Sequence, residues 1–152
     1  MCGIVGFISN SSCPDILGSM LKAQSHRGPD DSGSVICTDN DKFIHLGHNR
    51  LSIQDTSFNG HQPFSSNCNN YIIIFNGEVY NFKSIRSDLE TLGYIFISNS
   101  DTEVILYSYK EWGVSCIEKF RGMFAFVIYD KIEKKLFMFR DRAGVKPFYY
   151  YI

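Results

Sequence analysis

Short apolar runs alternate with polar, glycine- and proline-containing breaks along the whole chain, which is typical of a protein rich in short strands. Two neighbouring runs are joined by a polar turn at Asp39-Asn40-Asp41, and two others form a hairpin around KIEKK. The runs predict strands at GIVGFI (3–8), SVICT (34–38), KFIHLGHNRLSI (42–53), YIIIF (71–75), YIFIS (94–98), MFAFVIYD (123–130), KLFMFRD (135–141) and FYYYI (148–152).

Helical spacing occurs in three places between these runs. A first helix begins near Pro14, a residue that suits a first helical turn. A second follows Asn81, which can cap it, and closes at Gly93. A third opens at the S-x-x-E pattern of residues 100–103 and runs to about Trp112. Because helices do not alternate strictly with strands, the sequence predicts an α+β protein of antiparallel sheets with helices on their outer faces.

The composition is that of an ordinary globular protein. The 152 residues are 44% hydrophobic and 20% charged, and the net charge of -1 gives no electrostatic case for binding nucleic acid or an anionic membrane. No apolar run approaches the length of a membrane span, and the N-terminal run lacks the basic start of a signal peptide. Five cysteines at irregular spacing fit neither a disulfide framework nor a zinc site, and His45 and His48 would project to opposite faces of one strand. We therefore expect one domain without a metal site, in the reducing cytoplasm.

Cys2 is the first candidate for chemistry. If Met1 is removed, Cys2 carries both a thiol and a free α-amine. A free α-amine titrates near ~7.7–8.0 and a thiol at roughly 8.5, so the amine can act as general base for a nucleophile on the same residue. The alternative is that Cys2 is simply a small apolar residue at the chain terminus.

Three other positions each allow two interpretations. Asn76-Gly77 follows a buried strand and is either an ordinary turn or a pair of N–H donors for an oxyanion. Arg50 stands among apolar neighbours and needs an anionic partner, which is either a protein carboxylate or a ligand. Asp101 lies at the predicted start of a helix, where it either caps the helix or meets a ligand ammonium.

Eight motifs together resemble one family. Each alone is modest, but they cover essentially the whole chain and stand in the order found in glutamine-hydrolysing asparagine synthetases. They are MCGIVGFIS, HRGPDDSG, LGHNRLSIQD, GHQPF, FNGEVYNF, SDTEVIL, GMFAFVIYD and RDRAGVKPFYY. The resemblance is to the N-terminal glutaminase domain, a class II glutamine amidotransferase. It implies an N-terminal-nucleophile hydrolase fold, which is a four-layer α/β/β/α sandwich of two antiparallel sheets.

The resemblance also implies the catalytic roles. Cys2, exposed by loss of Met1, resembles the nucleophile that attacks the side-chain amide of L-glutamine. Asn76 and the N–H of Gly77 match the oxyanion hole of the family. The implied reaction is hydrolysis of glutamine to glutamate and ammonia through a γ-glutamyl thioester, which needs no cofactor.

The substrate-binding residues follow from the same resemblance. Arg50 resembles the arginine that pairs with the α-carboxylate of glutamine, while Asp101 and Glu78 match the acidic residues that hold its α-ammonium. The segment after the arginine is expected to line the pocket with its backbone; it comprises Leu51, Ser52, Ile53 and Gln54. Gln54 departs from the family, in which a branched apolar residue is usual.

The synthetase half of the family has no counterpart in these residues. Its nucleotide-binding loop is absent, so ATP and Mg²⁺ are expected only with a synthetase domain supplied in cis or in trans. The chain ends inside a predicted strand, and we therefore expect residues 1–152 to be a glutaminase domain truncated at its C-terminus. Two alternatives remain: an amidotransferase that serves another acceptor, such as a sugar nucleotide, and an inactive fragment.

Overall fold

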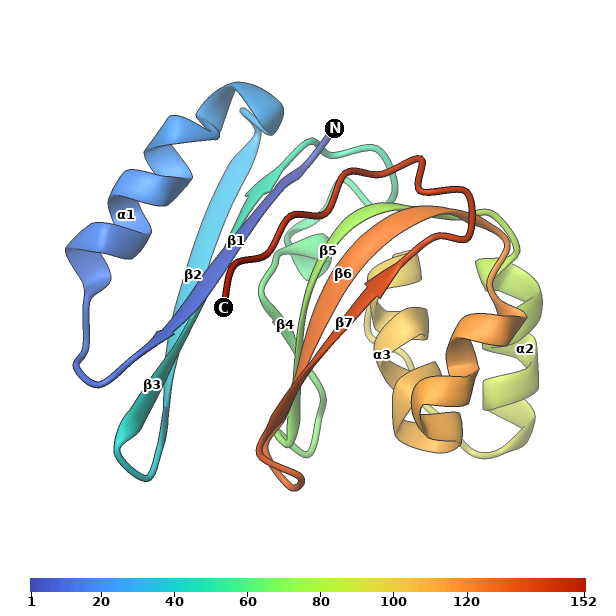
Figure 1. Cartoon of the computed structure of the whole chain (residues 1–152). Helices are drawn as coiled ribbons and strands as arrows, with labels where there is room; N and C mark the ends of the chain where they lie inside the picture. Colours follow the sequence, from blue (N-terminus) through green and yellow to red (C-terminus); the bar gives the residue numbers. More distant parts are fainter.

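Two antiparallel sheets face each other at the centre of the molecule, and helices cover the outer face of each sheet (Figure 1). The computed structural model describes residues 1–152. The layers follow one another as helix, sheet, sheet and helices, which confirms the predicted α+β class and the α/β/β/α arrangement. None of the helices combines the length and the apolar character that a membrane-spanning helix requires.

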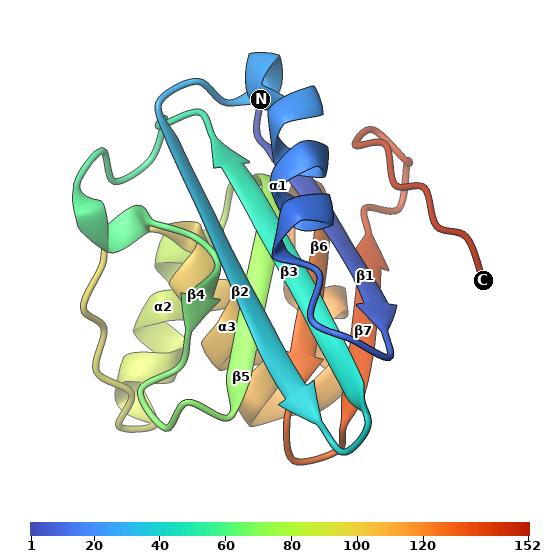
Figure 2. The ribbon, with the colours of Figure 1, turned by 90° about the vertical axis from the view of Figure 1, so that its left-hand side faces the viewer.

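The first sheet has the strand order β1-β3-β2. It consists of β1 (Gly3–Ser9), β2 (Asp31–Asp39) and β3 (Lys42–Arg50), and α1 (Pro14–Ala23) lies across its outer face (Figure 2). A 3₁₀ turn, Ser25–Arg27, follows α1. In the antiparallel pairings Gly3 lies opposite Asn49 and Asp31 lies opposite Arg50. The N-terminus and the beginning of β2 therefore both meet the end of β3.

The second sheet has the strand order β4-β5-β6-β7. Its strands are β4 (Phe64–Ser65), β5 (Tyr71–Val79), β6 (Gly122–Asp130) and β7 (Lys135–Arg140). The helices α2 (Phe82–Thr91) and α3 (Asp101–Trp112) pack on its outer face, and 3₁₀ segments occupy Phe58–Gly60 and Gly113–Lys119. β6 and β7 form the predicted hairpin.

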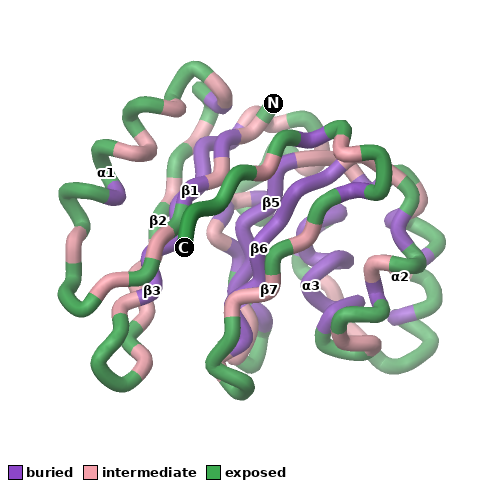
Figure 3. Tube along the Cα trace, in the orientation of Figure 1, coloured by how far each residue is buried: buried purple, intermediate pink, exposed green.

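Strand β5 contributes to two separate cores, which explains its uninterrupted apolar run. Side chains alternate between the faces of a strand. Ile72 and Ile74 pack between the sheets, whereas Ile73 and Phe75 pack against α2 and α3. The core between the sheet and these two helices is the larger one, and the buried parts of the chain in Figure 3 concentrate on β5, β6 and α3.

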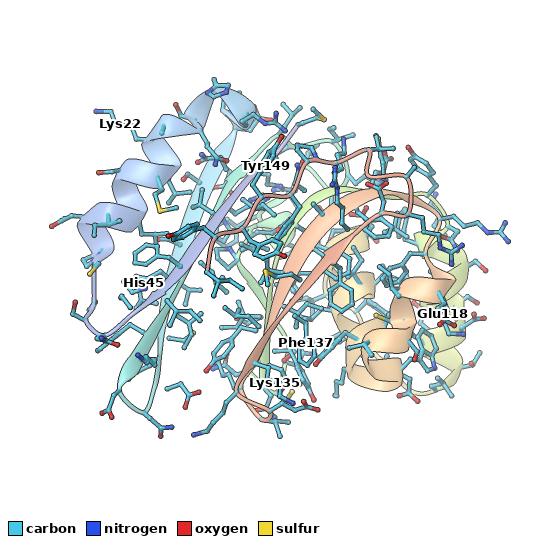
Figure 4. All side chains as sticks on the ribbon, in the orientation of Figure 1. Lys22, His45, Glu118, Lys135, Phe137 and Tyr149 are labelled. Carbon is cyan, nitrogen blue, oxygen red and sulfur yellow. The ribbon has the colours of Figure 1, made fainter.

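Two predicted strands do not form. Residues 94–98 have the alternating pattern of a strand but no strand partner; the N–H groups of Ile97 and Ser98 instead donate to the Glu103 carboxylate, at 3.0 and 2.8 Å. Residues 148–152 are also outside any strand, and Tyr151 is 99% exposed. Tyr149 lies on this segment, beyond the hairpin (Figure 4).

Several element boundaries also differ from the prediction. β2 begins three residues before the predicted strand, β3 ends at Arg50, and β5 continues through Asn76-Gly77 to Val79. The Asn81 side chain does not cap α2: its Oδ1 accepts from the Arg121 N–H at 2.9 Å and its Nδ2 donates to the carbonyl oxygen of residue 119 at 3.0 Å. At α3 the predicted cap is confirmed, because the side-chain oxygen of Ser100 accepts from the Glu103 N–H.

Candidate active site

Cys2 lies directly before β1 and beside the end of β3. Its thiol contacts the backbone of Leu51, with the Leu51 N–H 3.4 Å and the Leu51 carbonyl oxygen 3.7 Å from Sγ. The Gly3–Asn49 register produces this contact, because one further step of the pairing places Cys2 opposite Arg50, directly before Leu51. Cys2 is partly exposed, so its thiol is accessible to a ligand.

Cys2 lines a pocket together with residues from both sheets and from α3. All the predicted site residues line this pocket except Ser52, whose N–H donates to the Asp30 carboxylate at 2.7 Å. The lining residues that the sequence analysis singled out are Cys2, Arg50, Leu51, Ile53, Gln54, Asn76, Gly77, Glu78 and Asp101. One concave surface therefore holds a thiol, an amide, an arginine and two carboxyls that are far apart in the sequence.

Asn76 and Gly77 belong to β5 and not to a turn. Gly77 lies opposite Phe124 in the pairing with β6, and a Cβ atom on Gly77 would overlap the Met123 carbonyl oxygen. Glycine is therefore required by the close approach of the neighbouring strand. Asn76 is buried and lines the pocket. The turn interpretation of this dipeptide was wrong, and its role as a pair of donors for an oxyanion stays a prediction.

The residue before Asn76 is held by two side chains from other elements. Gln62 Oε1 accepts from the Phe75 N–H at 2.7 Å, and His48 Nε2 lies 3.0 Å from the Phe75 carbonyl oxygen. β4 pairs only with residues 72 and 73, so Gln62 provides the partner that β4 no longer supplies at Phe75. Burial lowers the pKa of His48 to about 4, so the ring is neutral and its Nε2 donates. Gln62 also donates to Thr102 at 3.1 Å, which links the strand to α3.

Arg50 is buried, and its guanidinium contacts backbone carbonyls only. It donates to the carbonyl oxygens of Ser57 at 3.0 Å and Gln54 at 3.3 Å, and also to that of Asp55. A Cβ atom on Gly60 would overlap Nη2, so the glycine makes room for the arginine. No carboxylate forms a salt bridge with Arg50. An anionic ligand therefore stays the predicted partner of Arg50.

Two carboxyls form the acidic part of the pocket. Asp101 is the first residue of α3, and its Oδ2 accepts from the Val79 N–H at 2.9 Å. Burial raises the pKa of the Asp101 carboxyl to about 6, the Val79 hydrogen bond opposes the rise, and the charge of Glu78 adds to it. Gln54 donates to Glu78 at 2.7 Å, so the residue that departs from the family holds one of these carboxylates.

Some lining residues were missed by the sequence analysis. Gln62 and Lys146 belong to the quoted motifs GHQPF and RDRAGVKPFYY but received no role there, and Met123 begins the quoted strand MFAFVIYD. Their side chains reach the pocket only through the packing of distant segments, which no local pattern encodes.

The histidines outside the pocket confirm the strand geometry. His45 and His48 lie on opposite faces of β3, as predicted. His45 (Figure 4) accepts through Nε2 from the Cys13 N–H beside α1 at 3.0 Å, whereas His48 Nε2 lies 3.0 Å from the Phe75 carbonyl oxygen of the second sheet. No group of three or more His, Cys, Asp or Glu side chains is placed to hold a metal ion.

The fold agrees with that of a known enzyme structure. The structure is similar to the glutamine phosphoribosylpyrophosphate amidotransferase from B. subtilis, with a TM-score of 0.75, 22% identity, and coverage of 95% of this chain and 38% of that one. This likeness shows that the two chains share a fold, here a sandwich of two antiparallel sheets between helices.

The family follows from the sequence comparisons. The family model of the glutamine amidotransferase domain matches residues 1–152, and the chain belongs to this family. It is 41% identical to a putative glutamine-hydrolysing asparagine synthetase 2 of Methanocaldococcus jannaschii and 40% identical to asparagine synthetase 1 of Bacillus subtilis. Amidase chry2 of Gibberella zeae is 37% identical. Each match covers 99% of this chain, which spans only 32%, 24% and 24% of these relatives.

Proposed function

We propose that this chain is a glutaminase domain that hydrolyses the side-chain amide of L-glutamine, with Cys2 as the nucleophile. The observation that carries the proposal is the single pocket in which Cys2 and the Asn76-Gly77 pair lie together with Arg50 and Asp101. An amide and an amino-acid backbone need complementary groups at opposite ends of such a site, and these residues provide both.

The catalytic step begins once Met1 has been removed. The free amine of Cys2 takes the thiol proton, and Sγ attacks the amide carbon of glutamine. The side chain of Asn76 and the N–H of Gly77 donate to the oxyanion that develops on the amide oxygen. The C–N bond breaks, the amine returns the proton to the departing ammonia, and a γ-glutamyl thioester remains. Water then adds to the thioester, which releases glutamate and regenerates the thiol.

Charge complementarity orients the substrate. Arg50 has a buried guanidinium without a carboxylate partner, which suits the α-carboxylate of glutamine. Glu78 and the ionised form of Asp101 suit its α-ammonium. The two charged groups on the α-carbon of the amino acid are thereby held by groups of opposite sign, which discriminates against simple amides.

The ammonia is proposed to serve asparagine synthesis. This part of the proposal is supported by relatives named glutamine-hydrolysing asparagine synthetases that align with the whole chain. Activation of the acceptor with ATP and Mg²⁺ would belong to a synthetase domain joined in cis or supplied in trans. The relative named as an amidase indicates that the same domain also occurs in proteins with other names, so the acceptor is tested separately.

A glutaminase assay on the purified chain tests the proposal. The chain with Met1 removed, as verified by mass spectrometry, should release glutamate from glutamine, and the form that retains Met1 should be inactive because its Cys2 nitrogen is an amide. Cys2→Ala should abolish release, whereas Cys13→Ala, a free cysteine outside the pocket, should not. Absence of glutamate release by the fully processed chain would refute the proposal.

A further inference from the structure

Lys146 lies in the turn that follows β7, and hydrogen bonds fix its backbone. The Asp141 carboxylate accepts from the N–H groups of Val145 and Lys146 at 2.8 and 2.9 Å. Arg140 Nε donates to the Lys146 carbonyl oxygen at 2.7 Å. The backbone of Lys146 is held on both sides, so its side chain enters the pocket from a defined position.

The ammonium of Lys146 is buried against the N-terminal residue. Lys146 is only 3% exposed, and its Nζ lies 2.8 Å from Met1 Sδ. It forms no salt bridge. Lysines are almost never so buried unless they are paired, and a thioether is a weak acceptor. The partner of this ammonium is therefore the residue that must leave before the proposed reaction can start.

We propose that Lys146 is a positioning residue which, after Met1 is removed, places its ammonium beside the new N-terminus and biases Cys2 toward its reactive protonation state. This inference rests on the proposed role of Cys2. Loss of Met1 removes the thioether from Nζ and places the α-amine of Cys2 at the same end of the pocket. A nearby cation disfavours a second positive charge and favours a negative one. Lys146 therefore favours the neutral amine, which can accept a proton, and the thiolate, which attacks.

Other charged groups line the pocket of Cys2 and Lys146 or lie on the segments that surround it. Their contribution stays the same when only Lys146 is changed, so a comparison of variants isolates the effect of the lysine. They are Arg27 after α1, Asp30 before β2, Arg50 at the end of β3, Glu78 on β5, Asp101 on α3, and Arg140 and Asp141 at the end of β7.

The test measures the protonation of Cys2 without relying on turnover. Processed chains are alkylated with iodoacetamide over a range of pH, and mass spectrometry of the N-terminal peptide reports the labelling of Cys2 alone. The midpoint of labelling should move upward by about one pH unit in Lys146→Met. It should stay near the wild-type value in Lys146→Arg, which keeps the cation. Lys83→Met, which changes an exposed lysine on α2, is the matched control.

The acidic limb of the kcat/KM profile for glutamine provides a second readout. It should shift in the same direction in Lys146→Met, because a more basic amine must be deprotonated before it can act. Thermal unfolding checks that each variant is folded, and Lys146→Gln replaces Lys146→Met if the latter is not.

The outcomes separate this inference from the proposed function. A processed wild-type chain that hydrolyses glutamine, with labelling midpoints unmoved by Lys146→Met and Lys146→Gln, would overturn the inference and leave the function standing. A shifted midpoint in a processed chain without glutaminase activity would support the inference about Cys2 and refute the function.

Discussion

Replacement of Asp101 by asparagine should stabilise the folded chain at neutral pH while impairing glutamine binding. Asp101 is buried at the start of α3, and its pKa is raised from 3.8 to about 6, chiefly by burial. Asparagine has nearly the same shape, keeps an oxygen that can accept from the Val79 N–H, and carries no charge. The substitution therefore removes the cost of ionising a desolvated group.

The magnitude follows from the raised pKa. A pKa unit corresponds to about 1.4 kcal/mol, so a rise from 3.8 to about 6 corresponds to ~3 kcal/mol in the free energy of unfolding. The folded chain binds this proton more tightly than the unfolded chain. The stabilisation by the proton is therefore complete below about pH 4 and is lost as the pH rises through about 6. Asp101→Asn does not lose this stabilisation, so the difference in unfolding free energy between the variant and wild type should grow with pH.

Urea unfolding at several pH values measures this effect. The difference in unfolding free energy between Asp101→Asn and wild type should increase by about 2 kcal/mol between pH ~4.5 and ~7.5. The matched control is Asp88→Asn, which removes the same kind of charge from the exposed side of α2. A pH-independent difference for Asp101→Asn would refute the desolvation argument. The KM for glutamine should rise in the same variant, because the ionised carboxyl is proposed to bind the α-ammonium.

Three further substitutions test the groups around the amide end and the ammonium end of the pocket. Asn76→Ala should lower kcat by about 10²–10³ with little change in KM, since it removes one oxyanion donor; an unchanged kcat in steady-state assays would leave it a structural residue. Gln62→Met should leave the Phe75 N–H without its acceptor and lower the unfolding free energy by roughly 1–3 kcal/mol, as measured by urea titration. Gln54→Val should free Glu78 and raise KM about fivefold, the equivalent of ~1 kcal/mol, and an unaltered KM would show that the hydrogen bond does not position the carboxylate.

The predicted strands that form in the structure are those that find another strand to pair with. YIIIF and MFAFVIYD are apolar on both faces because β5 and β6 are central strands between two cores. YIFIS has the same local character but forms no strand, because its N–H groups at Ile97 and Ser98 bind the Glu103 carboxylate. Strand propensity describes a suitable surface, and pairing decides whether the strand forms.

Capping was predicted correctly at one helix and wrongly at another for a similar reason. The S-x-x-E pattern at α3 involves neighbours in the sequence, so the local signal sufficed for the serine cap. At α2 the Asn81 side chain binds the backbone at residues 119 and 121 instead. A capping residue type identifies the helix start, but a distant partner can take its side chain. Glu103 is an intermediate case, since its carboxylate reaches back beyond the cap to residues 97 and 98.

In the site, too, the sequence indicated residues with distinctive chemistry but not the residues that hold them in place. Cys2, Arg50 and Asp101 were singled out because their chemistry is unusual for their sequence positions. Gln62 and His48 were given no role, although both hold Phe75 next to the proposed oxyanion donor. Their hydrogen bonds join residues that are 13 and 27 positions apart, so only the folded sandwich reveals them.

Arg50 connects these arguments, because its surroundings distinguish a ligand site from an ion pair. A buried guanidinium that donates to three carbonyl oxygens keeps its hydrogen bonds but has no salt-bridge partner, and an arrangement of this kind costs stability. The carboxyl of Asp101, which lines the same pocket, is also costly to ionise, because burial raises its pKa. The two groups form no salt bridge with each other, and hydrogen bonds within the protein relieve each cost only in part. A zwitterionic amino acid carries one group of each sign and would relieve both costs at once, so the proposed site should prefer free glutamine to an uncharged amide.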